Sequence, residues 1–206
     1  MGSFEENIAI SANIRSDFAL IAKWIGNKAK VLDLGCGDGS LLSQLRETHH
    51  IRGYGVEKDD SNWLKAMING IDVIQMDLEA GLSGFEAQSF DVVVLSQTLQ
   101  AVLNTESIVL EMLRVGREAI VTFPNFGYWK HRIQLVAGKM PVSKNLPYQW
   151  YDTPNVHLCT IKDFDEFCMK HEIEIMERLV LTDKEPINFM PNLMGSLAMY
   201  RIKAGK

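Results

Sequence analysis

The chain has 206 residues, 47% of them hydrophobic and 23% charged, a balance that excludes wholesale disorder and suits one globular domain over residues 1–206. Its formal net charge of −5 argues against a non-specific nucleic-acid binder, which needs a positive surface to displace counterions. The three cysteines form no C-x-x-C pair, and neither a membrane-spanning run nor a signal-peptide core is present, so we expect a cytoplasmic protein with no metal site and no membrane partner.

Helices and strands alternate along the first 123 residues. An amphipathic helix is predicted over residues 8–25, where isoleucine and phenylalanine recur at near-helical spacing. After it, in chain order, we expect a strand at 30–34, a helix at 39–47, a strand at 51–57, a helix at 60–70, strands at 71–77 and 90–96, a helix at 105–116 and a strand at 117–123. Such alternation predicts parallel strands joined by right-handed crossovers.

The character of the chain changes after Phe123. Residues 124–160 are rich in proline, aromatic residues and asparagine, with at most one helix near 127–137, and a long irregular segment of this kind is usually functional. A helix at 162–170 and strands near 173–181 and 195–202 complete the pattern. We therefore expect an α/β fold with a doubly wound, mostly parallel seven-stranded sheet and helices on both faces. The segment 124–160 is expected to face an acceptor or a partner.

The stretch VLDLGCGDGS at 31–40 places three glycines directly after a buried strand. It lacks the lysine of a phosphate P-loop, and its glycine spacing is not that of a dinucleotide fingerprint. Asp33 at the mouth of the turn would repel a pyrophosphate, but it would attract a ligand with an ammonium and a sulfonium group, as S-adenosylmethionine has. The alternative is an ordinary tight turn whose glycines supply positive φ angles.

Polar residues at the ends of the following strands fit the same ligand, because ligands of such sheets bind at the carboxyl ends of the strands. Glu57 could accept both ribose hydroxyls, and Asp77 could accept the adenine amino group while the Leu78 N–H donates to the ring. The full candidate set for S-adenosylmethionine or S-adenosylhomocysteine is Asp33, Gly35, Cys36, Gly37, Gly39, Glu57, Lys58, Asp77, Leu78, Ser96 and Gln97.

The D-x-G-x-G-x-G pattern at 33–39 resembles that of class I S-adenosylmethionine-dependent methyltransferases. By that resemblance, Asp33 helps to hold the amino group of the ligand, and the glycines let the backbone approach its methionine portion. Longer stretches within residues 31–164 are similar to the MetW family of methionine-biosynthesis proteins, above all EMLRVGREAIVTFPNFGYWKHR and GKMPVSKNLPYQWYDTPNVHLCTIKDF. This resemblance implies a methyltransferase fold and work with the homoserine O-acyltransferase MetX in support of homoserine acylation. It does not imply methyl transfer.

The sequence leaves the methyl-transfer activity open. The fourth strand ends in SQTLQA, not in the Asn/Asp-Pro-Pro-Tyr/Phe motif of nucleic-acid amino-methylating enzymes, and no cysteine follows a proline, so nucleic-acid methylation is disfavoured. Candidate residues for contact with a substrate or a partner are Asn125, Tyr128, Trp129, Arg132, Tyr151, Asp152 and His157. None forms a spacing that demands catalysis, and for His157 a structural hydrogen bond is favoured over proton transfer.

Two classes of function follow. As a subunit, the chain would bind the nucleotide as a signal and meet MetX through residues 124–160. In that segment Trp129, Arg132, Tyr148, Trp150 and Tyr151 are the side-chain types that dominate interfaces. As an enzyme, it would methylate a small molecule, with the same segment closing over the acceptor. The family resemblance favours the subunit, and a homodimer through the aromatic cluster is a further alternative.

Overall fold

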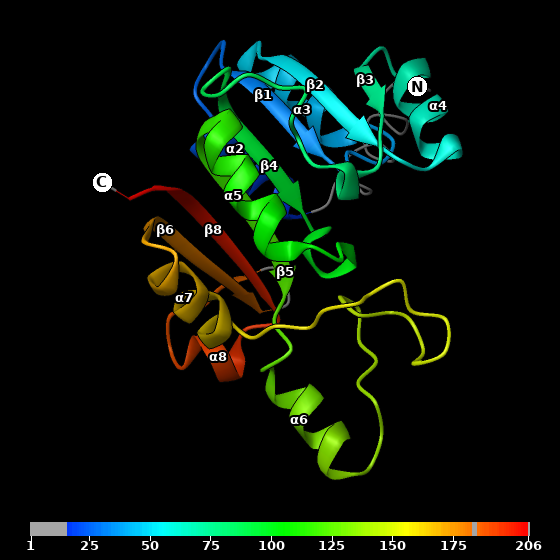
Figure 1. Ribbon diagram of the computed structural model, residues 1–206. Coiled ribbons are helices and arrows are strands. Elements are labelled where there is room, and N and C mark those ends of the chain that lie inside the picture. Colours follow the sequence, from blue (N-terminus) through cyan, green and yellow to red (C-terminus); the bar gives the residue numbers. More distant parts are fainter. Residues whose placement is uncertain (1–15, 183–184, 206) are drawn as a thin grey trace, which may run out of the picture.

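The computed structural model describes residues 16–182 and 185–205, and these form one eight-stranded sheet in the order β3-β2-β1-β4-β5-β8-β6-β7 (Figure 1). The sequence predicted seven strands. The additional strand is β7 (Glu185–Pro186), a two-residue edge strand that pairs antiparallel with β6 (Ile173–Thr182). Two residues are too few to produce a hydrophobic period, so no sequence pattern could have predicted this strand.

The first half of the chain forms the parallel part of the sheet, as predicted. Its strands are β1 (Lys30–Leu34), β2 (Arg52–Glu57), β3 (Asp72–Gln75), β4 (Phe90–Ser96) and β5 (Gly116–Pro124). The central strands β1 and β4 consist largely of valine and leucine, and β5 contains the run Ala119–Phe123; these residues are buried on both faces, the usual pattern of a parallel sheet. β3 is shorter than the predicted 71–77 because Asp77 caps the 3₁₀ turn η1 (Leu78–Ala80) by accepting from the Glu79 N–H.

The second half adds the antiparallel strands. β8 (Leu197–Ala204) lies between β5 and β6 and runs antiparallel to both. A one-turn helix that was not predicted, α8 (Pro191–Met194), precedes β8. The sheet is therefore parallel on the side of the glycine turn and antiparallel on the side of the chain's C-terminal strands.

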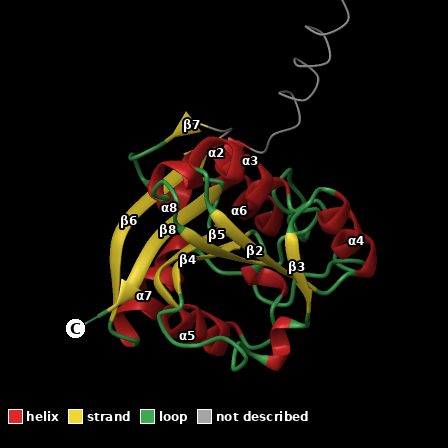
Figure 2. Cartoon of the chain, turned by 90° about the horizontal axis from the view of Figure 1, so that it is seen from above, coloured by secondary structure: helices red, strands yellow, loops and turns green. Residues whose placement is uncertain are grey.

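Helices cover both faces of the sheet, as expected (Figure 2). On one face lie α2 (Ser16–Trp24), α3 (Ser40–His49) and α4 (Asp60–Ile68), and on the other lie α5 (Thr105–Val115) and α7 (Ile161–Lys170). The predicted helix at 8–25 is confirmed from Ser16 onward, and its first residues fall outside the described ranges. No helix within those ranges is long and apolar enough to cross a bilayer.

The helix α6 (Trp129–Val136) stands apart from these layers. It follows the end of β5, and Figure 1 shows it projecting from the carboxyl edge, away from the helices that cover the sheet. Residues 137–160 return to α7 without a further helix or strand apart from one isolated bridge, Ser143 to Leu146. This agrees with the prediction of a single helix near 127–137 in an otherwise irregular segment.

Candidate functional site

The glycine turn follows β1 and runs against the end of β2. The N–H groups of Gly35 and Cys36 donate to the Val56 carbonyl oxygen over 2.8 and 3.0 Å. Gly35, Gly37 and Gly39 have φ angles of +70°, +57° and +77°, the left-handed region that glycine adopts without strain. The backbone of the turn therefore favours glycine at all three positions.

The surroundings of the three glycines differ. A Cβ on Gly35 would lie 2.8 Å from the Thr98 side chain, and one on Gly39 would lie 2.7 Å from Cγ1 of Ile71. A Cβ on Gly37 would meet nothing within 4 Å. Packing within the protein thus accounts for the absence of a side chain at Gly35 and Gly39, whereas the space beside Gly37 is open to a ligand.

Glu57 ties the glycine turn to the end of β2. Its Oε2 accepts from the Gly37 N–H over 2.8 Å, and its Oε1 accepts from the Lys58 and Asp59 N–H groups, both also over 2.8 Å. A carboxylate offers about four acceptor positions, and these backbone bonds use most of them. For Glu57 to accept two ribose hydroxyls, one backbone donor has to give way.

Asp33 and Cys36 lie at the centre of this edge. Asp33 is 3% exposed and sits in register between Gly55 of β2 and Val94 of β4. The Cys36 sulfur occupies the space next to Gly55, where a Cβ would lie only 2.5 Å from it. Burial, together with the charges of Asp33 and Glu57, raises the pKa of the Cys36 thiol to about 12, so Cys36 is a packing residue and not a thiolate nucleophile. Gly55, a glycine in the interior of β2, is the signal in the sequence that could have predicted this close approach.

Lys58 and Asp77 form an ion pair across the ends of β2 and β3. The Lys58 Nζ lies 2.6 Å from Oδ2 of Asp77, and Oδ1 of Asp77 accepts from the Glu79 N–H. The hydrogen bond from Lys58 is the main cause that lowers the pKa of the Asp77 carboxyl, and the Glu79 N–H adds to it. Asp77 is thus ionised at neutral pH and able to accept from an adenine amino group, but Lys58 competes for one of its oxygens.

Replacing Lys58 with methionine is expected to raise the pKa of Asp77 toward its ordinary value, which a titration of the Asp77 carboxyl by NMR would measure. The ion pair also makes the folding stability depend on pH. Its contribution to stability is complete above the ordinary pKa of Asp77 and is lost as the pH falls through the lowered pKa of the folded protein. In Lys58→Met the pKa values of Asp77 in the folded and unfolded protein become more alike. The variant should therefore lose less stability than the native chain when the pH is lowered. Both side chains are substantially exposed, at 69% and 42%, so we expect little change in thermal stability at pH 7. An unchanged Asp77 titration would contradict the pairing.

The end of β4 is fixed by contacts that the sequence did not reveal. Gln97 has a φ of +53°, and its N–H donates to both the carbonyl oxygen and Oγ1 of Thr122, over 2.9 and 3.0 Å. Its Nε2 donates to Oδ2 of the buried Asp17 in α2 over 2.9 Å, and Ser96 Oγ lies 3.2 Å from Thr122 Oγ1. A strained backbone held by several partners is typical of functional edges. Asp17 is therefore an additional residue of this edge.

The candidate residues for a substrate or a partner do not lie together, and two of them are buried. Asn125 is fully buried: its Nδ2 donates to the Asn192 and Gly195 carbonyl oxygens, and its Oδ1 accepts from the Gly127 N–H. Tyr128 is also buried, at the root of α6. These two residues position α6 and α8, and neither side chain lies on the surface.

The remaining candidates are accessible. Trp129 and Arg132 lie on α6, where the Arg132 Nε donates to the Gly127 carbonyl oxygen over 2.6 Å. Tyr151 and Asp152 lie in an exposed turn, in which Asp152 accepts from the Gln149 N–H. The Nε2 of His157 lies 3.0 Å from the Leu103 carbonyl oxygen, a structural hydrogen bond of the kind that the sequence favoured.

A cavity of about 750 Å³ lies between α5, α7 and residues 157–159. Its apolar lining includes Leu99, Leu103, Leu110, Phe123, Pro124 and Phe167. Polar groups on its wall come from the first turn of α5 and from Gln100 and His157. Leu99 and Gln100 follow directly after Thr98, which contacts Gly35, so the turn η2 (Leu99–Ala101) separates the cavity from the glycine turn. Within the described ranges, no cluster of three potential metal ligands is found.

Comparison with known sequences identifies one family. A family model described as methionine biosynthesis protein MetW matches residues 15–202. A curated relative from Rhodopirellula baltica, named bifunctional methionine biosynthesis protein MetXA/MetW, is 40% identical over 161 residues. The aligned region covers 73% of this chain but only 26% of that relative, so this chain spans a minor part of the longer protein.

Solved structures show the same fold at low sequence identity. A TehB-like SAM-dependent methyltransferase from Corynebacterium glutamicum has a TM-score of 0.64 at 17% identity, over 97% of this chain and 93% of that one. The [4+2]-cyclase SpnF has a TM-score of 0.66 at 15% identity, over 91% and 80%. The chain thus has the Rossmann-like methyltransferase fold that these two structures share. The two names also illustrate that one fold carries different activities.

Proposed function

The chain belongs to the MetW family of methionine biosynthesis proteins, and on that premise we propose that it binds S-adenosylmethionine or S-adenosylhomocysteine and associates with a homoserine O-acyltransferase. The observation that carries the partnership is the relative named MetXA/MetW, in which both proteins form one polypeptide. Joining two proteins in one chain raises their effective concentration for each other, which favours a functional contact. Residues 124–160 are the proposed partner-facing segment.

The carboxyl edge of the sheet supports the nucleotide part of the proposal. Asp33, Glu57 and Asp77 supply negative charge at the ends of three neighbouring strands, and the space beside Gly37 is open. Acidic groups and a glycine backbone suit a ligand with an ammonium group, a ribose and an adenine better than they suit a polyphosphate. When bound, S-adenosylmethionine supplies an electrophilic methyl group. In the subunit proposal it acts as a signal, because it is formed downstream of methionine.

The test is the acyltransferase activity of the purified pair, with and without this chain and with and without saturating nucleotide. We expect this chain to raise the activity and the nucleotide to change it by about fivefold or more, the lower range of typical coupling between sites. Such a response requires the nucleotide to bind one state of the complex more tightly than another. Acyltransferase activity that is unchanged by saturating nucleotide would contradict the signalling role of the nucleotide. Failure of the two proteins to co-purify would contradict the partnership.

A second candidate function is methyl transfer to a small molecule, and the cavity favours it. Its volume of about 750 Å³ is that of a small-molecule site, and the turn η2 separates it from the glycine turn by a few residues. Its lining predicts an acceptor with an apolar body. Methyl transfer is an in-line displacement whose main requirement is positioning, so it needs no general base unless the acceptor must lose a proton. Release of S-adenosylhomocysteine when the chain is incubated with cell extract would identify the enzyme, and nucleotide binding without release would favour the subunit.

A further inference from the structure

The outward face of α6 is an apolar stripe. Trp129, Ile133 and Val136 follow one another at helical spacing and are 36%, 57% and 90% exposed. The opposite side of the helix carries His131, whose Nε2 pairs with Ser143 Oγ over 2.9 Å, and Gln134, whose Oε1 accepts from the Val142 N–H over 3.0 Å. The return segment thus holds α6 by its polar side and leaves the apolar stripe uncovered.

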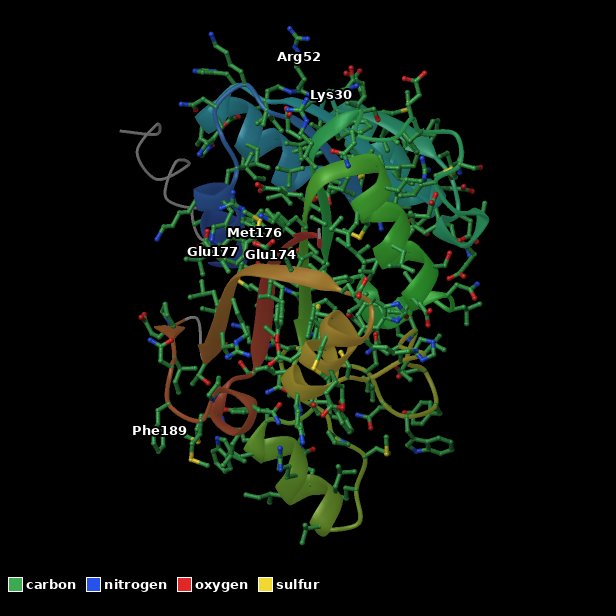
Figure 3. The ribbon with its side chains drawn as sticks, turned by 60° about the vertical axis from the view of Figure 1, so that its left-hand side comes forward. Lys30, Arg52, Glu174, Met176, Glu177 and Phe189 are labelled. Carbon is green, nitrogen blue, oxygen red and sulfur yellow. The ribbon has the colours of Figure 1, made fainter. Side chains whose placement is uncertain are left out.

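The stripe lies at an extreme of the molecule. In Figure 3, α6 projects from the end opposite to the labelled Lys30 and Arg52, which mark the amino ends of β1 and β2. The stripe therefore lies on the carboxyl side of the sheet, the side of the glycine turn, and its projection leaves it accessible to a large partner. An exposed apolar helix face of this kind is suited to a groove on another protein.

The return segment carries a second group of exposed apolar side chains. Trp150 and Tyr151 are 72% and 70% exposed, and their rings pack edge to face with centroids 5.7 Å apart. Next to them is a small pocket of about 50 Å³, lined in part by Met140, Tyr148 and Trp150. A pocket of this size accepts the tip of one apolar side chain. Central aromatic residues and small pockets are the features on which protein interfaces depend most.

The charge of the segment selects among the partners that could cover this face. Residues 124–160 contain four cationic side chains, Lys130, Arg132, Lys139 and Lys144, and a single carboxylate, Asp152, although the whole chain has a net charge of −5. Lys130 and Arg132 flank the stripe on its two sides, since successive helix residues are about 100° apart. A second copy of this chain would bring the same cations together, which disfavours a homodimer. A bilayer offers no side chain to fill the pocket.

We infer that the docking face, defined as Trp129, Ile133, Val136, Trp150 and Tyr151, binds a surface of the homoserine O-acyltransferase in which an apolar groove is edged by carboxylates. This inference rests on the partnership proposed above and specifies the surface that mediates it. Arg132 contributes to the basic rim, whereas the buried Tyr128 and Asn125 only position the helix. The stripe residues Ile133 and Val136 were not singled out by the sequence analysis, because an apolar residue in a helix is usually buried.

The experiment measures the affinity of the acyltransferase from the same organism for four forms of the full chain. They are the native chain, the double variant Ile133→Glu/Val136→Glu, the single variant Trp150→Ala and the control Ile68→Glu. Ile68 lies at the end of α4 and is 75% exposed, so its substitution matches the stripe variants in chemistry but lies outside the docking face. We expect at least about a tenfold loss of affinity for the double variant and for Trp150→Ala, the usual effect at central interface residues, and none for Ile68→Glu.

Three parallel measurements make each outcome decisive. Nucleotide titration of every variant reports whether the fold and the glycine turn are intact, sedimentation with vesicles containing anionic lipid reports membrane binding, and size-exclusion chromatography reports self-association. Equal capture of the native chain and the double variant overturns the docking face while leaving the partnership intact. Absence of capture of the native chain overturns the partnership and the docking face together. If the stripe variants lose vesicle binding or self-association but keep the acyltransferase, the face belongs to a membrane or to a second copy, and the inference is wrong.

Discussion

Gly37→Ala is expected to retain the fold and lose the nucleotide, whereas Gly39→Ala is expected to lose stability first. Both positions have positive φ angles, +57° and +77°, so alanine costs about 1 kcal/mol or more of backbone strain at either one. Only Gly39 adds a clash, because its Cβ would lie 2.7 Å from Cγ1 of Ile71, inside a packed region. Overpacking of this kind costs roughly 1–3 kcal/mol more. The expected losses of stability are therefore about 1 kcal/mol for Gly37→Ala and about 2–4 kcal/mol for Gly39→Ala.

The loss of nucleotide affinity should be larger for Gly37→Ala than for folded Gly39→Ala, the opposite of the order in stability. The Cβ of Gly37→Ala points into the space that meets no protein atom within 4 Å and that we assign to the methionine portion of the ligand. We expect the affinity for S-adenosylmethionine and for S-adenosylhomocysteine to fall at least about tenfold, equivalent to about 1.4 kcal/mol. Thermal unfolding without ligand and isothermal titration with each nucleotide separate the two effects. Native-like binding by Gly37→Ala would show that the turn does not hold this part of the ligand.

The layered sheet could be predicted because its strands carry strong local signals. The strands at 30–34 and 90–96 have the predicted bounds, since short runs of valine and leucine bounded by polar residues are typical of buried parallel strands. β3 is shorter than predicted because the capping bond of Asp77 ends it, and the two-residue β7 depends on its neighbour β6. These differences arise from single hydrogen bonds and edge pairing, which leave no periodic pattern in the sequence.

The candidate site could be predicted at the level of strand ends but not of side-chain pairs. Glu57 and the glycine turn lie together because parallel strands bring their carboxyl ends to one edge, and the bond from Gly37 to Glu57 realises that expectation. The pair of Gln97 with Asp17 joins residues 80 positions apart, and the exposed stripe of α6 depends on which face the return segment covers. Such contacts are decided by packing across the fold. From the sequence alone, an asparagine that follows a strand, such as Asn125, is equally consistent with contacting a ligand and with making structural hydrogen bonds inside the protein.

Glu57→Gln is expected to produce the largest loss of nucleotide binding of any single isosteric change. The amide can present its one oxygen to the Lys58 and Asp59 N–H groups, but its NH₂ group then faces the Gly37 N–H, and two donors oppose each other across the turn. The unsatisfied donor lowers the stability of the turn by about 1–3 kcal/mol, and each hydrogen bond from a ribose hydroxyl to the charged carboxylate contributes about 1.5–3 kcal/mol to binding. The affinity should therefore fall about a hundredfold or more, equivalent to roughly 3 kcal/mol.

The matched control is Glu118→Gln in β5. The Glu118 carboxylate accepts from Arg201 through both oxygens, at 2.7 and 3.2 Å. Its replacement therefore also disrupts hydrogen bonds to a carboxylate, but between β5 and β8 and not at the glycine turn. Glu118→Gln should lower the unfolding temperature while binding nucleotide as the native chain does, whereas Glu57→Gln should lose binding by isothermal titration. Equal affinities for the two variants would mean that Glu57 only braces the turn. Because its carboxylate already accepts three backbone N–H groups, that outcome would assign the ribose to another acceptor on the same edge, where Asp33 of β1 and Asp77 after β3 belong to the two strands that flank β2.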